Sequence, residues 1–309
     1  MITKVEAVAQ LLENFVRNYT DIAVVGISGG IDSAVVASIS VAALGPKNVY
    51  LISMPYGELD QQTFNLRSAE LADQLAANHL VVNIGKATDT ILAEFKNAYE
   101  TVLDKKADLH LLTGGNTRAR MRMTTLYALA GELTYNLQEE QIAHAHINPT
   151  RGQVFAAKRV RVLGTGNASE DLIGYDTKGG DALADLFLIG DLFKSEVYQL
   201  AKHYGVPKSI VMATPSAGLY EGQTDEAELG FSYEALEPAL SALHYALRRG
   251  LKDDELSPKL DEFASVDRKL AEWVIARFRA NAHKHRAPAV VTVRHTDLVR
   301  DIWNEKRIK

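Results

Sequence analysis

The sequence predicts an α/β fold with a doubly wound parallel sheet. Nearly continuous apolar runs, typical of strands covered on both faces, occur at residues 22–27, 49–54 and 80–84. Segments with helical periodicity follow these runs at residues 32–43, 61–77 and 89–103. Because strands and helices alternate in this way, we expect parallel strands joined by right-handed crossovers.

The other expected elements extend this pattern over a single domain that covers residues 1–309. They are a helix at residues 5–19, a helix at 118–136, a strand at 159–164, a helix at 194–203 and mainly helical structure beyond it. Residues 138–158 show no clean periodicity, so we interpret them as an excursion from the fold. The pair His144 and His146 in this excursion suggests a metal site, although no third ligand accompanies it.

The composition excludes several classes of function. With 309 residues, of which 47% are hydrophobic, the chain can bury one large core. Its net charge of -5 provides no broad attraction for nucleic acid or an anionic membrane, so we expect neither as a partner. The lack of cysteine excludes disulfides, thiolate zinc sites and a cysteine nucleophile, and it fits a cytoplasmic location. No run approaches the roughly 20 apolar residues of a membrane span, so we expect no export or membrane anchor.

The most specific motif is Gly26-Ile-Ser-Gly-Gly-Ile-Asp-Ser33, between a predicted strand and a predicted helix. Its glycines let backbone N–H groups surround an anion, and the helix N-terminus adds positive partial charge. Bare phosphate would repel Asp32, which therefore suggests a Mg²⁺ ion that bridges the phosphates. The motif is neither a Walker loop nor G-x-G-x-x-G, so γ-phosphate hydrolysis and hydride transfer are not indicated. The alternative is a tight turn in which Asp32 caps the helix.

The stretch Ser28-Gly-Gly-Ile-Asp-Ser33 resembles the pyrophosphate loop of the ATP pyrophosphatases, which split ATP into AMP and pyrophosphate. Further stretches resemble the motifs of the ammonia-dependent NAD synthetases, in the same order, at residues 115–123, 164–178, 177–194, 215–230 and 281–288. The resemblance implies a Rossmann-like sheet of the adenine nucleotide alpha-hydrolase type, with extra C-terminal helices.

The resemblance also implies a set of site residues. Those implied to bind ATP are Gly26, Ile27, Ser28, Gly29, Gly30, Ile31, Asp32, Ser33, Thr165, Lys194 and Ser216. Those implied to contact deamido-NAD are Arg120, Lys178, Asp185, His283 and Lys284. Asp32 and Glu170 would hold Mg²⁺. Asp181 would hold or deprotonate ammonium, and Lys194 would bind an ATP phosphate, so both would be catalytic.

Several of these residues have a structural alternative. Arg120 could be a solvated surface arginine, and Glu170 could cap a helix. Residues 215–230 could form an ordinary surface loop, and residues 281–288 a solvated basic patch.

Four residues depart from the family pattern. Gly179 stands where the family has an aromatic residue, and Ala182 and Leu183 stand where small residues, usually glycine, are common. Ser53 stands where the family often has arginine. We therefore expect a reshaped nicotinate pocket and altered contacts with adenine or ribose.

The implied reaction joins deamido-NAD and ammonia to give NAD, while ATP becomes AMP and pyrophosphate through an adenylated intermediate. Because the chain lacks cysteine, we expect no glutaminase domain. The resemblance further implies a homodimer that binds deamido-NAD partly across its interface. The alternatives are another adenylating amidotransferase, a tRNA-modifying enzyme, or a nucleotide sensor without activity. A sensor would not need Asp32, Glu170 and Lys194 together.

Overall fold

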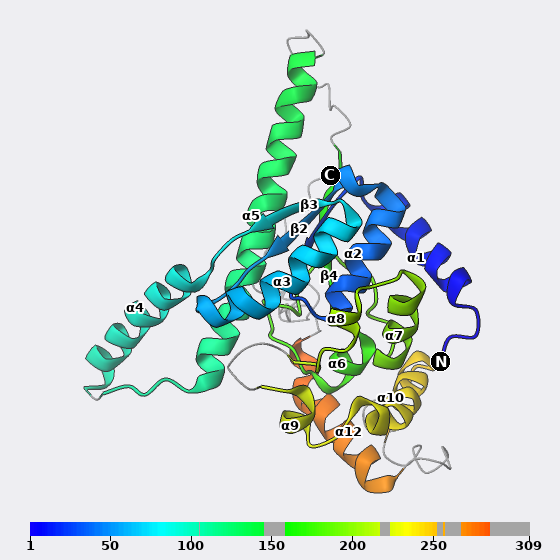
Figure 1. The fold of residues 1–309 in the computed structure, drawn as a ribbon. Helices are drawn as coiled ribbons and strands as arrows, with labels where there is room; N and C mark the ends of the chain where they lie inside the picture. Colours follow the sequence, from blue (N-terminus) through cyan, green and yellow to red (C-terminus); the bar gives the residue numbers. More distant parts are fainter. Residues whose placement is uncertain (105, 145–157, 217–222, 252–255, 257–266, 285–309) are drawn as a thin grey trace, which may run out of the picture.

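The computed structural model describes residues 1–104, 106–144, 158–216, 223–251, 256 and 267–284. Its centre is one all-parallel sheet of five strands in the order β3-β2-β1-β4-β5 (Figure 1). The strands are β1 (Ile22–Gly26), β2 (Val49–Ser53), β3 (Asn78–Val81), β4 (Val160–Gly164) and β5 (Leu186–Phe187). The predicted doubly wound parallel sheet is thereby confirmed. The sequence pattern did not predict β5, because two residues show no periodicity.

Helices follow most strands. The helical elements are α1 (Val5–Tyr19), α2 (Ile31–Leu44), η1 (Pro46–Asn48), α3 (Gly57–Leu75), α4 (Gly85–Leu103), α5 (Leu111–His144), α6 (Ala168–Ile173), α7 (Lys194–His203), α8 (Lys208–Val211), α9 (Asp225–Leu229), α10 (Tyr233–Arg248), α12 (Arg268–Asn281) and η3 (Ala282–Lys284). The predicted helix at residues 194–203 has the bounds of α7, whereas α3 and α4 begin four residues earlier than expected.

Both faces of the sheet are covered. On β1, Ala23 and Val25 pack with residues of α1, α2 and α7, whereas Ile22 and Val24 pack with residues of α5. Successive side chains of a strand point to opposite faces, so a strand between two helical layers needs apolar residues throughout. This explains the nearly continuous apolar run at residues 22–27, which contains β1. A second core joins α6, α10 and α12 below the sheet.

The order of the strands reverses beside β1, which pairs with β2 on one side and with β4 on the other. In open α/β sheets, ligands bind in the crevice outside the carboxyl ends of the strands at such a switch point. The motif at residues 26–33 follows β1, and the motif beginning at Gly164 follows β4. The topology therefore brings these two motifs to one crevice.

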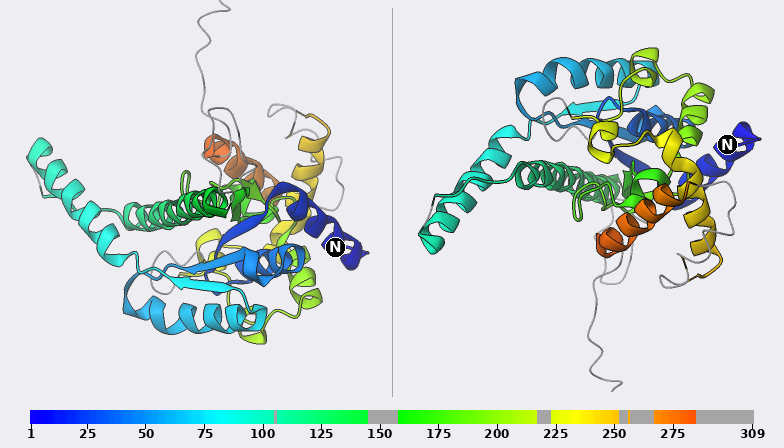
Figure 2. Two further views of the ribbon diagram at one scale, coloured as in Figure 1. Left: turned by 90° about the horizontal axis from the view of Figure 1, so that it is seen from above. Right: turned by 90° about the horizontal axis from the view of Figure 1, so that it is seen from below.

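Helix α5 corrects one prediction. It contains 34 residues, about 50 Å at 1.5 Å per residue, and ends at His144. The first seven residues of the excursion predicted at 138–158 are thus helical, while residues 145–157, including His146, lie outside the described part of the chain. Figures 1 and 2 show α4 and the end of α5 extending away from the sheet. The prediction was wrong here because the sequence of residues 138–144 lacks the apolar periodicity by which a helix is recognised.

None of the described helices is both long and apolar enough to cross a membrane.

Two glycine substitutions should change stability in opposite directions. A Cβ atom on Gly164 would lie 2.7 Å from the ring of Phe187 and 2.8 Å from the Cβ of Ala184. Gly164→Ala should therefore lower the free energy of unfolding by about 1–3 kcal/mol. A Cβ on Gly131, within α5, would meet nothing within 4 Å, so Gly131→Ala should raise it by about 0.5–1 kcal/mol. Chemical denaturation measures both, and equal effects of the two substitutions would contradict the packing described here.

Candidate active site

A cleft of about 1030 Å³ opens at the carboxyl ends of the strands. All eight residues of the motif at 26–33 line it. Other predicted site residues in its walls are Thr165, Glu170, Asp181, Lys194, Ser216 and Lys284. Ligand pockets usually measure about 300–1,000 Å³, so the cleft has room for a nucleotide and a second substrate.

The motif at residues 26–33 forms a preshaped loop. Gly29 has a φ of 74°, a left-handed conformation that favours glycine. The Ser33 hydroxyl accepts a hydrogen bond from the N–H of Ser28 at 3.2 Å and donates one to the Gly30 carbonyl at 3.0 Å. The N-cap of α2 is Gly30, so the alternative that Asp32 caps this helix is wrong. The loop thus presents backbone N–H groups and the N-terminus of α2 to the cleft.

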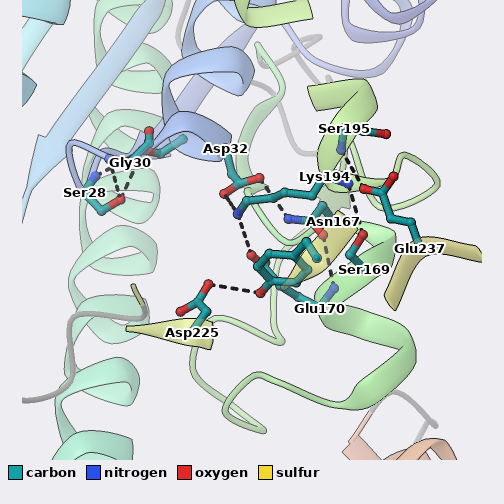
Figure 3. A network of polar contacts seen from close by, with 12 residues as sticks. Ser28, Gly30, Asp32, Asn167, Ser169, Glu170, Lys194, Ser195, Asp225 and Glu237 are labelled. Carbon is teal, nitrogen blue, oxygen red and sulfur yellow. Dashed lines mark hydrogen bonds and ion pairs between the residues drawn. The ribbon is translucent and has the colours of Figure 1, made fainter. Parts of the chain in front are cut away.

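Lys194 joins the two acidic residues for which a metal was predicted (Figure 3). Its Nζ lies 2.6 Å from Asp32 Oδ2 and 2.9 Å from Glu170 Oε1. The Lys194 side chain is only 4% exposed, and those of Asp32 and Glu170 are 18% and 19% exposed. Because the Glu170 carboxylate contacts Lys194, the alternative that it merely caps α6 is wrong. We call Asp32, Glu170 and Lys194 the ion-pair cluster.

Asn167 orients this cluster, a role that the sequence analysis missed. It is fully buried and is the N-cap of α6. Its amide Nδ2 donates to Asp32 Oδ1 at 2.9 Å, and its Oδ1 accepts from the N–H of Glu170 at 3.1 Å (Figure 3). The spacing Asn-x-x-Glu is a capping signature that could have identified it.

A third carboxylate, Asp225, also lines the cleft and was missed. It is 3% exposed, and its Oδ2 accepts a hydrogen bond from the Tyr233 hydroxyl at 3.0 Å. Its Oδ1 is buried and has no hydrogen-bond partner among the residues that the structure describes. The signal in the sequence was the position of Asp225 within residues 215–230, the stretch that resembles a family motif. Three carboxylates therefore face one ammonium group.

Burial and charge shift the pKa values in this region. Burial raises the pKa of Glu170 to about 7, although Lys194 opposes the rise. Burial likewise raises the pKa of Asp225, again against the effect of Lys194. Burial alone would lower the pKa of Lys194, but the carboxylates of Asp32 and Glu170 outweigh it and raise that pKa. The site thus holds a firmly charged lysine and an excess of negative charge.

Residues implied to contact deamido-NAD come together from three distant parts of the chain. Arg120 on α5 donates from Nε to the carbonyl of Lys178 at 3.2 Å. Lys178 in turn donates from Nζ to the carbonyl of His283 at 2.7 Å, next to Lys284. Of these four residues, Lys284 lines the cleft. Lys284 therefore places a positive charge in the wall of the cleft, and we call this part of the wall the basic end of the site.

The two other aspartates of this motif occupy different environments. Asp181 lines the cleft, where its Oδ1 accepts a hydrogen bond from the N–H of Thr177 at 2.8 Å. Its side chain is accessible from the cleft, yet the surrounding protein reduces its hydration and raises its pKa to about 6. Asp185 does not line the cleft: its Oδ2 accepts from the N–H of Val162 at 2.8 Å. The structure therefore does not place Asp185 with the other predicted substrate contacts.

Ser53, one of the residues that depart from the family pattern, lies in the wall of the cleft beside β2. Ser53 is buried and shares a hydrogen bond with His79, at 2.8 Å between Oγ and Nε2. Arg67 on α3 and Arg122 on α5 line the same cleft, and the latter donates from Nε to the carbonyl of Met54. These arginines supply positive charge where Ser53 cannot.

The fold and the site together define an α/β enzyme of the adenine nucleotide alpha-hydrolase type that uses ATP. A family model described as NAD synthase matches residues 4–138 and 152–288. The chain therefore belongs to the NAD synthase family.

Individual relatives agree with this assignment. The NH(3)-dependent NAD(+) synthetase of Methanococcoides burtonii is 35% identical over 281 residues, which cover 91% of this chain and 90% of the relative. That of Methanococcus aeolicus is 40% identical over 223 residues, which cover 71% and 74%. Among solved structures, NMN synthetase from Francisella tularensis has a TM-score of 0.67 and 28% identity, and covers 93% of this chain and 98% of that one.

Removing the lysine of the ion-pair cluster should destabilise the fold. Lys194→Met leaves two buried carboxylates without their cation, which should lower the free energy of unfolding by about 3–5 kcal/mol. Adding Asp32→Asn and Glu170→Gln to this variant should recover most of the loss. The control is Lys202→Met, on the exposed side of the same helix, with an expected effect within about 0.5 kcal/mol. Urea denaturation tests this, and no recovery in the triple variant would contradict it.

Proposed function

We propose that the chain makes NAD from deamido-NAD, ATP and ammonia, with AMP and pyrophosphate as the other products. It is a ligase that forms a C–N bond, as its family membership implies. The observation that carries the proposed mechanism is the ion-pair cluster beside the phosphate-binding loop. This arrangement supports chemistry in which pyrophosphate leaves, because charge that develops there meets fixed cations and N–H donors.

We further propose that Asp32 and Glu170 hold Mg²⁺ together with the phosphates of ATP. The residues fit such an ion, because oxygen ligands suit Mg²⁺ and the carboxylates of Asp32, Glu170 and Asp225 lie on the same side of the cleft as Lys194 and outnumber it. The described residues contain no ready cluster of three ligating side chains, so phosphate and water would complete the coordination. When bound, the ion would neutralise charge on the phosphates.

In the first step, an oxygen of the nicotinate carboxylate attacks the α-phosphorus of ATP, and the bond to pyrophosphate breaks. The N–H groups of the loop at residues 26–33 and the α2 N-terminus stabilise the departing pyrophosphate. The ammonium group of Lys194 leaves one of its two carboxylate partners and binds a phosphate oxygen, so its positive charge also stabilises the pyrophosphate. The product is an acyl adenylate, which remains in the cleft.

In the second step, ammonia attacks the acyl carbon of the adenylate, and AMP leaves. The nitrogen loses one proton, so a base near it assists the reaction. Asp181 is suited to this role because it lines the cleft and is ionised at neutral pH, given a pKa of about 6. As an anion, it also attracts ammonium to the basic end of the site, where Lys178 and Lys284 lie.

We also propose a homodimer and a cytoplasmic location, the latter because the chain has no cysteine.

An exposed apolar stripe on α4 supports the dimer. Ile91, Phe95, Tyr99 and Val102 recur at helical spacing and are all exposed, with Val102 at 80%. Figure 2 shows α4 extending away from the sheet, and the part of the chain that the structure describes leaves these four side chains exposed. An apolar stripe of this kind marks an interface.

An assay of the products tests the proposed reaction. Purified protein is incubated with ATP, Mg²⁺, ammonium chloride and deamido-NAD, and NAD and AMP are measured together. We expect equal amounts of both products, reduced at least about 100-fold by Asp32→Ala. Nicotinate mononucleotide replaces deamido-NAD in a parallel reaction. A preference for the mononucleotide, or formation of AMP without an amide product, would contradict the proposed substrate or nucleophile.

The role of Asp181 predicts a pH dependence. The carboxylate works as an anion, and its pKa of about 6 means that protonation removes this function as the pH falls. The ratio of the wild-type rate to the rate of Asp181→Asn should stay constant above pH 7 and fall below about pH 6. The concentration of free ammonia also changes with pH, but it changes equally for both proteins, so it cancels in the ratio of their rates. Single-turnover formation of NAD provides the measurement, and a ratio independent of pH would eliminate Asp181 as the base.

The α4 stripe predicts the effect of surface charges on assembly. The double substitution Ile91→Glu and Phe95→Glu should convert a dimer into a monomer of 33.9 kDa. The control is Leu11→Glu, at an exposed leucine of α1, which should remain dimeric. Sedimentation equilibrium measures both masses. A dimer that survives the double substitution would place the interface elsewhere.

A further inference from the structure

We propose that residues 281–284 act as a strap that positions the loop at residues 173–181, and thereby Asp181, for the nicotinate end of the substrate. The inference rests on the proposed function, because that function gives Asp181 its role. It assigns to Asn281 and Lys284 an action through the loop, distinct from direct contact with deamido-NAD.

Hydrogen bonds join the strap to the loop. Asn281 donates from Nδ2 to the carbonyl of Ile173 at 3.3 Å. Lys284 donates from Nζ to the carbonyls of Gly174 and Asp176, both at 2.7 Å. In the opposite direction, Lys178 donates to the strap at the carbonyl of His283. These bonds tie segments separated by about a hundred residues of sequence, and they satisfy carbonyl groups that follow the end of α6.

The contact at Gly174 is too close for any other residue. Gly174 ends α6 with a φ of 62°, and a Cβ built on it would lie 2.0 Å from the Cβ of Asn281. Loop and strap are therefore in direct contact at this point. The helix that carries the strap is itself fixed, because Ala271, Val274 and Ile275 of α12 belong to the second core. The strap is thus a rigid support.

The far end of the loop rests on α5. The Thr177 hydroxyl donates to Asn116 Oδ1 at 2.7 Å, and a Cβ on Gly180 would lie 2.9 Å from that of Ala119. Within the loop, the N–H of Thr177 donates to Asp181. Asp181 is therefore placed by a loop that is held on one side by α5 and on the other by the strap. Loss of either support would let its carboxylate move.

The role of Lys284 follows from its contacts. Lys284 donates two hydrogen bonds to carbonyls of the loop and forms an ion pair with Asp176, whose Oδ1 lies 3.6 Å away. Two of its three ammonium protons are therefore committed to the loop, so direct binding of a substrate phosphate has only the third proton available unless a strap contact breaks. The lysine charge also lowers the pKa of Asp181, against the stronger raising effects of burial and of Asp176. The strap therefore influences both the position and the charge state of Asp181.

Two substitutions remove the strap contacts in different ways. Asn281→Ala deletes the amide without changing charge, and Lys284→Met deletes the ammonium. The control is Lys269→Met, at an exposed lysine on the same helix, α12. Unfolding midpoints of all three variants confirm that each is folded before any comparison.

Two measurements are made on each variant with the full chain. The first is kcat together with the KM for deamido-NAD and for ATP; because Asp181 acts in the second step, we expect kcat to fall at least 10-fold and the KM for ATP to change less than 2-fold in both strap variants, with no change in the control. The second is hydrogen exchange without substrates; we expect the amides of residues 174–182 to exchange at least 10-fold faster, with those of β1 unchanged.

The outcomes separate the strap from direct binding. A raised KM in Lys284→Met alone, with unchanged loop exchange, would show that Lys284 contacts the substrate directly and would overturn the proposal. Faster loop exchange with unchanged kcat would overturn it too, because the loop position would then not matter for the step that Asp181 assists. If wild-type protein fails to use deamido-NAD, the proposed function fails. Faster loop exchange in both strap variants would still support the strap.

Discussion

The ion pairs of Lys194 with Asp32 and Glu170 constrain the whole active site. Asp32 comes from the start of α2, Glu170 from α6 and Lys194 from the first turn of α7. All three are largely removed from water, where a charged group is costly unless its partners are in place. The motifs after β1 and β4 must therefore meet the start of α7 in one arrangement. Asn167 secures this arrangement, because it bonds to both acidic residues at once.

The two ends of the cleft carry different charges. At one end, backbone N–H groups and a helix N-terminus attract phosphate, while the carboxylates nearby attract a cation. At the basic end, Lys284 donates to backbone carbonyls, and Lys178, which does not line the cleft, donates to the carbonyl of the adjacent His283. Hydrogen bonds to carbonyls hold these lysines in place while leaving their charge uncancelled, apart from Asp176 near Lys284. A nucleotide phosphate and a second anionic substrate can thus approach from different directions.

Strong local patterns made much of the fold predictable. β1, β2, β4 and α7 were expected within about one residue, because buried parallel strands have continuous apolar runs and amphipathic helices have clear periodicity. The length of α5 was not predicted, since the sequence of residues 138–144 carries no clear periodicity although the helix continues to His144. β5 was missed because two residues carry no periodic signal. Asp225 was missed because it stands beside other acidic residues in the polar stretch 215–230, and the local pattern does not show which of them is buried.

The sequence by itself determined the alternation of strands and helices, the phosphate-binding loop and the resemblance to one family, because these depend on residues close together in the chain. Only the tertiary structure decided which distant residues meet. It brought Arg120, Lys178 and His283 into contact, placed Asp185 against β4 and paired Lys194 with two carboxylates. The physical reason is that such contacts depend on how helices pack on the sheet and on which buried charges find partners, neither of which a local pattern encodes.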